Sequence, residues 1–570
     1  MKGFFLLAAL ALCLSAYTQN TGVEKQNMGS VIETYNADIE DLNKVYIFKD
    51  SPEYFERFKK YYNEALQKLQ SLPFNTLPVS EQADYILLKR NITKAAEELA
   101  WAESIYKQIS YAVPFADKII ALQTQRRRGK SLNPAEAASI INSVKADVTL
   151  VRSQVEKAAP MAAPLARKAG DAVDGLRRGL QNFYSFYNTY DPLFTWWTKK
   201  PYEEADSALV MYAAFVRSKA AKETTAKDDG SGIVGNPIGA EALKEALRYE
   251  MIPYTAEELV AIANREFAWC DAEMLKASKE LGYGTNWKAA LEKIKENYVE
   301  PGKQPELVNR LAEEAIAFVE KNNLVTVPPL AKEAWRMFML TEAQQRLAPF
   351  FLGGESILVG YPTSNMDDET KTMSMRSNNY GFSHATVFHE LIPGHNLQYF
   401  MSKRYKPYRS VFRTPFSVEG WALYWEMLLW DKGFDDTPEK KIGALFWRMH
   451  RCARIIFSIN YHLGKWTPQQ CIDFLVERVG HERFSAEGEV RRSFTGGYGP
   501  LYQVAYMMGG LQLRALYKDV VGTGKVKERD FHDRFLHENA IPIELFRAIV
   551  TDQKLTENFT TQWRFADGKH

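Results

Sequence analysis

Residues 383–395 read SHATVFHELIPGH, a segment that holds three of the nine histidines in the 570-residue chain. The three are His384, His389 and His395. Neutral imidazole is a common protein ligand of transition metals, and a glutamate directly after a liganding histidine can act on metal-bound water. The segment therefore indicates a catalytic metal site in which Glu390 is the acid–base group.

The spacing between His389 and His395 does not fit a regular helix. Six residues turn an ideal helix through about 600°, which leaves the two imidazoles on different faces, whereas a spacing of four would bring them together. Pro393 and Gly394 lie between them. Because proline lacks a backbone donor and glycine accepts unusual dihedral angles, this pair is suited to interrupt a helix. We therefore predict a break at Pro393–Gly394 that returns His395 to the metal bound by His389.

A third ligand is expected on a neighbouring helix, since catalytic zinc sites use three protein ligands and leave a position for water. Glu419 is the best candidate. It opens the segment EGWALYWE, in which Gly420 and Ala422 permit close approach to another helix. A carboxylate among aromatic residues is costly to bury unless it is paired or metal-bound. Glu426 lies two turns later on nearly the same face, either as the acceptor of a histidine N–H or as a carboxylate at the rim of the site.

The rest of the chain is predicted to be mainly helical. In residues 54–66 the apolar positions recur at helical spacing, after Ser51, Pro52 and Glu53, which suit a helix start. Similar starts precede helices at Pro134, Ala256, Pro438 and Pro468, the second of them a capping box. The segment 356–360 is the one clear strand candidate, bracketed by Gly353-Gly354 and Tyr361-Pro362. We expect its edge to receive extended peptide by strand addition.

Composition narrows the class of protein. The chain has 72 lysines and arginines against 70 acids, a formal net charge of +2, so nothing in it favours a nucleic-acid partner. Residues 1–19 resemble a secretory signal peptide, with Lys2 before an apolar run too short to span a bilayer. Cys13 follows Leu12 rather than a small residue, which argues against lipoprotein processing there. Cys270, Cys452 and Cys471 suit buried thiols better than a disulfide scaffold.

We divide the remaining chain by composition. Residues 20–218 form an N-terminal helical region and residues 241–570 a C-terminal helical catalytic region. Residues 219–240 combine charge, glycine and proline without periodicity and form a loop or linker. The two helical regions can still share one continuous fold.

The paired motif HExxPGHxLQ from His389 and EGWALYxE from Glu419 resembles the signature of the bacterial domain of unknown function 885 (DUF885) family, whose helical proteins are similar to gluzincin-type zinc peptidases. The resemblance implies a zincin-like helical architecture with a deep cleft and a small β-element near the active site. It also implies one Zn²⁺ ion held by His389, His395 and Glu419, with Glu390 as base. The family often has a second histidine where this chain has Asn396.

The segment from Gly496 to Tyr506 offers donors for an oxyanion. It loosely resembles the Gly-Gly-Tyr and later tyrosine of thimet-type oligopeptidases, which stabilise the oxyanion and position the substrate. Among its phenols we choose Tyr506 and Tyr498 as catalytic residues, with an aromatic stripe in the core as the alternative. His384 and His462 are candidates for substrate contact or for support of a ligand, although a structural role is common for such histidines. Arginines that could hold a substrate carboxylate are Arg413, Arg451, Arg491 and Arg492.

The function expected from these parts is that of an exported zinc metallopeptidase, periplasmic or extracellular, that hydrolyses short peptides. No stable membrane association is expected after the signal peptide is removed. A metallohydrolase that acts on a different ester or amide, and a catalytically inactive zincin scaffold that only binds, are the alternatives. Manganese, cobalt or iron could replace zinc at the same ligands. The sequence leaves the oligomeric state and the choice between exopeptidase and endopeptidase open.

Overall fold

The structure is a computed structural model that describes residues 27–221, 229–495 and 497–567. The predicted signal peptide 1–19, Cys13, part of the 219–240 linker and Gly496 lie outside these residues. The chain divides into two compact units, which we call the small unit (residues 37–72 and 89–234) and the large unit (the other described residues). The predicted boundaries at 218 and 241 stay predictions.

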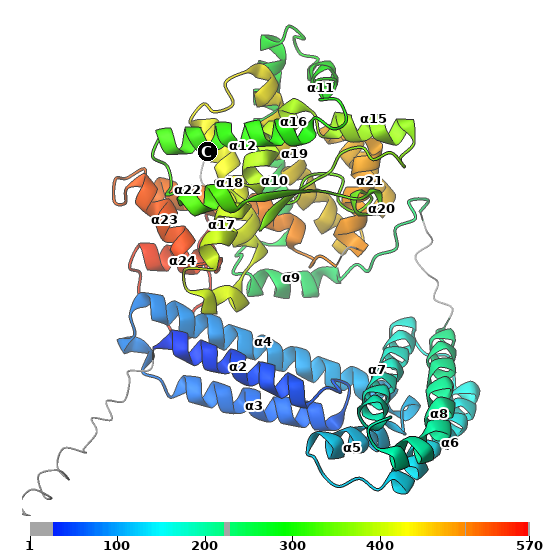
Figure 1. The fold of residues 1–570 in the computed structure, drawn as a ribbon. Coiled ribbons are helices and arrows are strands. Elements are labelled where there is room, and N and C mark those ends of the chain that lie inside the picture. The colour runs from blue at the N-terminus through cyan, green and yellow to red at the C-terminus, as the bar shows by residue number, and fades with distance from the viewer. Residues whose placement is uncertain (1–26, 222–228, 496, 568–570) are drawn as a thin grey trace, which may run out of the picture. The chain divides into compact units, whose positions relative to one another are not determined.

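Helices make up most of both units, as the sequence predicts (Figure 1). Two helices run from one unit into the other: α2 (Met28–Val45) and α4 (Val79–Ile109). The small unit also contains α3 (Pro52–Gln70), η2 (Ser110–Ala112), α5 (Ala116–Arg127), α6 (Pro134–Lys157), α7 (Ala163–Tyr187) and α8 (Pro192–Ser218). Helices α6, α7 and α8 pack side by side around a core of small and branched apolar residues.

The large unit contains the predicted site and the remaining helices. These are η1 (Phe74–Thr76), α9 (Gly239–Tyr249), α10 (Ala256–Glu280), α11 (Trp287–Lys295), α12 (Gln304–Lys321), α13 (Pro329–Ala334), α14 (Glu342–Gln345), α15 (Asp368–Ser377), α16 (Tyr380–Glu390), α17 (His395–Ser402), η3 (Pro407–Phe412), α18 (Pro415–Asp431), α19 (Pro438–His462), α20 (Pro468–Phe474), the π-helical turn η4 (Leu475–Val479), α21 (Arg483–Thr495), α22 (Tyr502–Val520), α23 (Glu528–His537) and α24 (Ile543–Val550).

The predicted helix starts are present where the sequence placed them. The side chain of Ser51 accepts a hydrogen bond from the backbone N–H of Tyr54, and Thr255 and Glu258 form the predicted capping box of α10. The side chain of Thr437 caps α19 by accepting from the backbone N–H of Lys440. Each of these bonds satisfies a backbone donor that a helix leaves unpaired at its first turn, which fixes where the helix begins.

Helices α16, α18, α19 and α22 form the core that surrounds the site. Helix α18 packs against α22, and α19 packs against α10, α16 and α22. Trp421 and Trp425 of α18 are fully buried, so this helix has almost no solvent face. Cys270, Cys452 and Cys471 are buried thiols, as predicted, and form no disulfide within the described residues.

The predicted strand is present as β2 (Ser356–Val359), paired in parallel with β1 (Arg336–Met339) in register Arg336 with Ser356. Ile357 and Val359 pack on Val387 of α16, which fixes the small sheet beside the motif helix. The prediction that the edge of β2 is open to a peptide is wrong at Leu358. Leu352 already exchanges both backbone hydrogen bonds with Leu358, at 2.8 and 3.0 Å, so an extended peptide has no free donor or acceptor there.

No helix in the described part of the chain combines the length and the apolar character needed to cross a bilayer. Taken together, the helices and strands of the described residues form a mainly helical fold with one small sheet. The finer expectation of a zincin-type architecture with a deep cleft stays a prediction.

Candidate metal centre

The predicted helix break lies between the two motif histidines. Helix α16 ends at Glu390 and α17 begins at His395. A Cβ atom on Gly394 would lie 1.9 Å from the carbonyl oxygen of His389, so only glycine allows the turn to close this tightly. The indole N–H of Trp421 donates to the carbonyl of Pro393 at 2.9 Å, which ties the turn to α18. The backbone therefore folds back as the Pro-Gly pair predicts.

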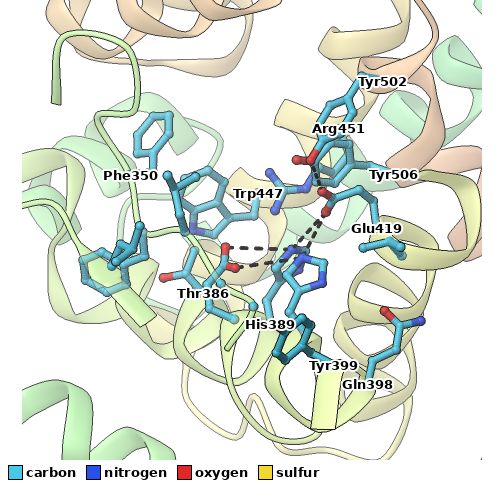
Figure 2. A pocket seen from close by; sticks show the side chains of 18 of the residues that line it. Phe350, Thr386, His389, Gln398, Tyr399, Glu419, Trp447, Arg451, Tyr502 and Tyr506 are labelled. Carbon is cyan, nitrogen blue, oxygen red and sulfur yellow. Dashed lines mark hydrogen bonds and ion pairs between the residues drawn. The ribbon is translucent and has the colours of Figure 1, made fainter. Parts of the chain in front are cut away.

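Three side-chain atoms converge at this turn. The Nε2 of His395 lies 3.0 Å and the Nε2 of His389 lies 3.8 Å from Oε2 of Glu419 (Figure 2). Ligand atoms about 2.0–2.1 Å from a tetrahedral zinc ion lie about 3.3 Å from one another. One of the two distances to Glu419 is shorter than that value and the other is longer. Glu419 Oε2 is also buried, and apart from these two imidazoles it has no partner, so a cation among the three atoms would offset the cost of burying the carboxylate. The residues present therefore fit a metal ion.

Close approach of two helices brings Glu419 to the histidines. Gly420 of α18 faces Gly509 of α22, and a Cβ on Gly420 would lie 2.6 Å from the Cα of Gly509. The sequence predicted that Gly420 would allow such packing. Because neither residue carries a side chain, the backbones come close enough to bury the carboxylate of the residue before Gly420.

Glu390 lies beside the three converging atoms. Its carboxylate oxygens are 4.0 Å from His389 Nε2 and 3.9 Å from His395 Nε2, so it is farther from the imidazoles than Glu419 is. His389, Glu390 and His395 also form a group of residues close enough to hold a metal. Glu419 is nearer to both rings than Glu390 is, which makes it the better candidate for a third ligand. Burial raises the pKa of Glu390 despite the opposing charge of the histidines, which suits a group that takes up a proton.

Glu426 fixes the orientation of His389. Its Oε1 lies 2.6 Å from His389 Nδ1, and Nη2 of Arg451 donates to the same oxygen at 3.4 Å. The sequence left two positions open for Glu426, and the structure places it as the acceptor of the histidine N–H. Burial disfavours a charged imidazole, yet the carboxylates of Glu390, Glu419 and Glu426 raise the pKa of His389 to about 9. This surplus of negative charge attracts a cation.

The tyrosine nearest to the ligands is Tyr502, which was not one of the two predicted catalytic tyrosines. The hydroxyl of Tyr502 donates to Oε1 of Glu419, the oxygen that does not face the histidines. Tyr498 stacks on Tyr502 with ring centroids 4.1 Å apart, and the ring of Tyr506 lies 6.3 Å from that of His389. All three phenols belong to one turn and helix, so the sequence signal was present. The spacing of four that they share could not tell which one contacts Glu419.

These residues line a cavity of about 310 Å³. Figure 2 shows Glu419, Tyr502 and Tyr506 on one side of His389, and Trp447 and Phe350 on the other. Of the arginines considered from sequence, Arg413, Arg451 and Arg492 line the cavity, and Arg491 is not among its lining residues. Arg454 of α19 also lines it and was missed. Arg454 donates to Glu489 of α21, and a pair between two separate helices leaves no pattern in the sequence.

Two predicted histidines lie away from the cavity walls. His384 is buried near Asp435, with Nδ1 to Oδ1 at 3.3 Å, and its ring stacks on Phe434. His462 ends α19 beside Tyr461 and Phe494, and burial lowers its pKa to about 4. Neither is among the residues that line the cavity in the described chain. Both positions fit the structural role that was the alternative.

Comparisons with known proteins agree with the motif. Residues 47–550 match the family model described as "Bacterial protein of unknown function (DUF885)". A search of curated proteins found no match. Among solved structures, a "putative lipoprotein of unknown function" from Shewanella oneidensis aligns with a TM-score of 0.66 at 18% identity, over 92% of this chain and 100% of the other. A "putative lipoprotein" from Colwellia psychrerythraea gives a TM-score of 0.56 at 15% identity, over 92% and 99%. At these identities the likeness shows the fold alone.

Proposed function

The chain belongs to DUF885, a family of bacterial proteins of unknown function, and we propose that it is a zinc-dependent peptidase that hydrolyses short peptides outside the cytoplasm. The observation that carries the proposal is the convergence of His389 Nε2, His395 Nε2 and Glu419 Oε2. Two imidazoles and one carboxylate are the ligand set of a known class of catalytic zinc sites. The second observation is the position of Glu390, whose carboxylate oxygens lie 4.0 and 3.9 Å from the imidazole nitrogens of His389 and His395, farther than those of Glu419.

Zinc bound by His389, His395 and Glu419 would lower the pKa of a water molecule and polarise the scissile carbonyl. The residues of the chain do the rest. Glu390 accepts a proton on its carboxylate and delivers it to the leaving amine. Glu426 keeps Nδ1 of His389 protonated, so that Nε2 is the atom available to a metal.

Tyr506 is the proposed donor to the oxyanion. It lines the cavity beside His389, while Tyr502 is engaged with Glu419. Burial and the charge of Glu419 raise the pKa of Tyr506, so its hydroxyl keeps its proton. A preorganised donor of this kind stabilises the charge that develops on the carbonyl oxygen. Tyr498, the other tyrosine chosen from sequence, stacks on Tyr502 and helps to form the wall of the substrate cavity.

The proposed location rests on two separate supports. The first is the apolar N-terminal segment, which resembles an export signal. The second is the pair of solved structures with a similar fold, both described as those of putative lipoproteins. We therefore propose that the chain works in the periplasm or outside the cell.

The test compares wild type with Glu390→Gln and His389→Ala. Zinc content is measured by elemental analysis, and cleavage of a peptide mixture by mass spectrometry. We expect one zinc ion in wild type and in Glu390→Gln, little in His389→Ala, and cleavage by wild type but by neither of these two variants. The matched control is Glu306→Gln, because Glu306 is an exposed glutamate of α12 whose ion pair with Lys303 is also exposed. Full activity of Glu390→Gln contradicts the proposal.

The same proteins, assayed in addition on small esters and amides, separate the two alternatives. A zinc-loaded wild type that cleaves small esters or amides, but no peptide, is a metallohydrolase of a different kind. A wild type that holds zinc and turns over neither class of substrate is a binding protein on an inactive scaffold.

A further inference from the structure

Three arginines that the proposed mechanism does not use line the same cavity. Arg451 and Arg454 belong to α19 and Arg492 to α21, and these residues are only 2–5% exposed. The guanidinium groups lie over aromatic faces of the cavity wall. Those of Arg451 and Arg454 are 4.9 and 4.2 Å from the ring centre of Tyr506, and that of Arg492 is 5.3 Å from that of Tyr498. We call these three residues the arginine wall.

The arginine wall has fewer negative than positive groups. Glu489 accepts from Nε of Arg454 at 2.7 Å, and its other oxygen lies 3.0 Å from Nε of Arg492. Nη2 of Arg451 lies 3.4 Å from Oε1 of Glu426, but the same oxygen also accepts from Nδ1 of His389. Among the ion pairs of the wall, two carboxylates therefore face three guanidinium groups, while Glu390 and Glu419 of the same cavity lie beside the histidines.

Donor atoms in the wall also lack partners. Nε of Arg451 and Nη1 of Arg454 are buried without a hydrogen bond. Burial lowers the pKa of Arg451, and the nearby Arg454 adds to this effect, although Glu426 opposes it. Buried donor atoms without partners are costly, so an anion that enters the cavity and accepts from them gains strong interactions there.

A buried arginine outside the cavity offers a comparison with the arginine wall. Arg448 lies on the same helix, one turn before Arg451, and pairs with its own carboxylate, Glu266, at 2.7 Å. It does not line this cavity. Nε of Arg448 also lacks a hydrogen bond, so unpaired donor atoms occur away from the cavity too. Arg448 nevertheless has a carboxylate to itself, whereas Arg454 and Arg492 share Glu489 at the cavity.

We propose that the arginine wall binds the C-terminal carboxylate of the peptide substrate, so that the enzyme removes residues from the carboxyl end. This inference rests on the proposed peptidase function. The wall lies close to the metal ligands, because a single oxygen of Glu426 contacts both Arg451 and His389. One residue of extended chain spans about 3.3–3.6 Å, so a carboxylate at the wall places the first or second peptide bond from the C-terminus at the metal ligands.

The cavity favours a chain end over an acidic side chain. Its volume of about 310 Å³ is at the lower limit for ligand pockets. Because the arginines are almost fully buried, a peptide cannot continue past them, whereas a terminal carboxylate can stop there. In the reaction the peptide C–N bond breaks, the hydroxyl of water joins the acyl carbon and its proton goes to the released amine.

Binding to zinc-loaded Glu390→Gln protein tests the inference without turnover. The ligands, measured by calorimetry, are an N-acetylated tripeptide of neutral residues with a free C-terminus, its C-terminal amide, and an amide-ended tripeptide that contains glutamate. We expect the free acid to bind at least about tenfold more tightly than both amides. Equal affinity of the free acid and its amide overturns the inference. Tight binding of the glutamate peptide alone assigns the wall to acidic side chains and also overturns it.

Variants then connect the preference to the wall. Arg454→Lys and Arg492→Lys keep the positive charge beside Glu489 but lose the planar fork, so the preference for the free acid should fall about tenfold while amide affinity stays the same. Arg491→Lys, next to Arg492 but outside the cavity lining, is the matched control. If either wall variant fails to fold, the other carries the test, and the comparison of the free acid with its amide needs no wall variant. An unchanged preference in every folded wall variant overturns the inference.

Cleavage assays on wild type separate this inference from the proposed function. Equal cleavage of the acid and amide peptides overturns the C-terminal assignment and leaves the peptidase in place. No cleavage of either peptide, together with tighter binding of the free acid, overturns the peptidase proposal and supports a carboxylate site.

Discussion

A single methyl group added at Gly420 should weaken zinc binding, because it pushes apart the two helices that position the ligand Glu419. In Gly420→Ala the new Cβ would lie 2.6 Å from the Cα and the carbonyl carbon of Gly509. Carbon atoms in good contact lie about 3.5–4.0 Å apart, so α18 and α22 must separate by about 1 Å. Glu419 precedes Gly420 and its Oε2 lies 3.0 Å from His395 Nε2. The shift therefore moves one of three ligand atoms by a large part of a zinc–ligand bond.

The size of the effect follows from two terms. Overpacking of a helix contact lowers the free energy of unfolding by about 1–3 kcal/mol, and the better helix propensity of alanine returns up to about 1 kcal/mol. We expect a modest fall in the thermal midpoint of the metal-free protein. Loss of ligand positioning typically costs a metal site about 10- to 100-fold in affinity, and we expect a fall of this size for zinc.

Competition with a zinc chelator measures the affinity, and a thermal scan measures the stability. Gly175→Ala is the matched control, because Gly175 lies inside α7 and a Cβ there would meet nothing closer than 3.8 Å. This variant should bind zinc like wild type and be equally or more stable. The reasoning is refuted if Gly420→Ala also binds zinc like wild type.

Three further predictions concern the residues around the ligands. Glu426→Gln should lower zinc affinity about 10- to 100-fold in a chelator titration, because it weakens the group that orients His389. Tyr502→Phe removes the hydroxyl bonded to Glu419 and should lower zinc affinity, whereas Tyr506→Phe should keep its zinc and lose about 100-fold in kcat with a peptide substrate. Zinc affinity should rise about tenfold per pH unit from pH 6 towards 9 and then level off, since zinc must displace a proton from His389, whose pKa in the metal-free protein is raised to about 9.

Each of these has a contrary outcome. Normal zinc affinity in Glu426→Gln shows that the histidine is positioned by the backbone alone. A fall in zinc content of Tyr506→Phe instead of Tyr502→Phe exchanges the two roles. A zinc affinity that does not change between pH 6 and 9 contradicts the protonation of His389.

Local sequence rules were enough for the backbone around the site. Helix geometry alone required a break between His389 and His395, and Pro393–Gly394 provides it at the end of α16. Turn and strand preferences identified β2 at 356–359. The edge of β2 was misjudged because its partner, Leu352, lies in a segment without a strand pattern of its own. An isolated bridge leaves no periodic signal in the sequence.

Side-chain partnerships between distant helices could not be read from the sequence. Tyr498, Tyr502 and Tyr506 are equally spaced, and the packing of α22 on α18 decides that Tyr502 contacts Glu419. Arg454 was missed because its partner lies 35 residues away. In the same way, His384 is near Asp435, which lies on a different segment of the chain.

The most direct test of the metal centre is a crystal structure of the zinc-loaded protein with anomalous scattering collected at the zinc absorption edge. One anomalous peak should lie about 2.0–2.2 Å from Nε2 of His389, Nε2 of His395 and a carboxylate oxygen of Glu419, with Glu390 near but unbound. A peak on other residues, or no peak in a protein saturated with zinc, contradicts the account.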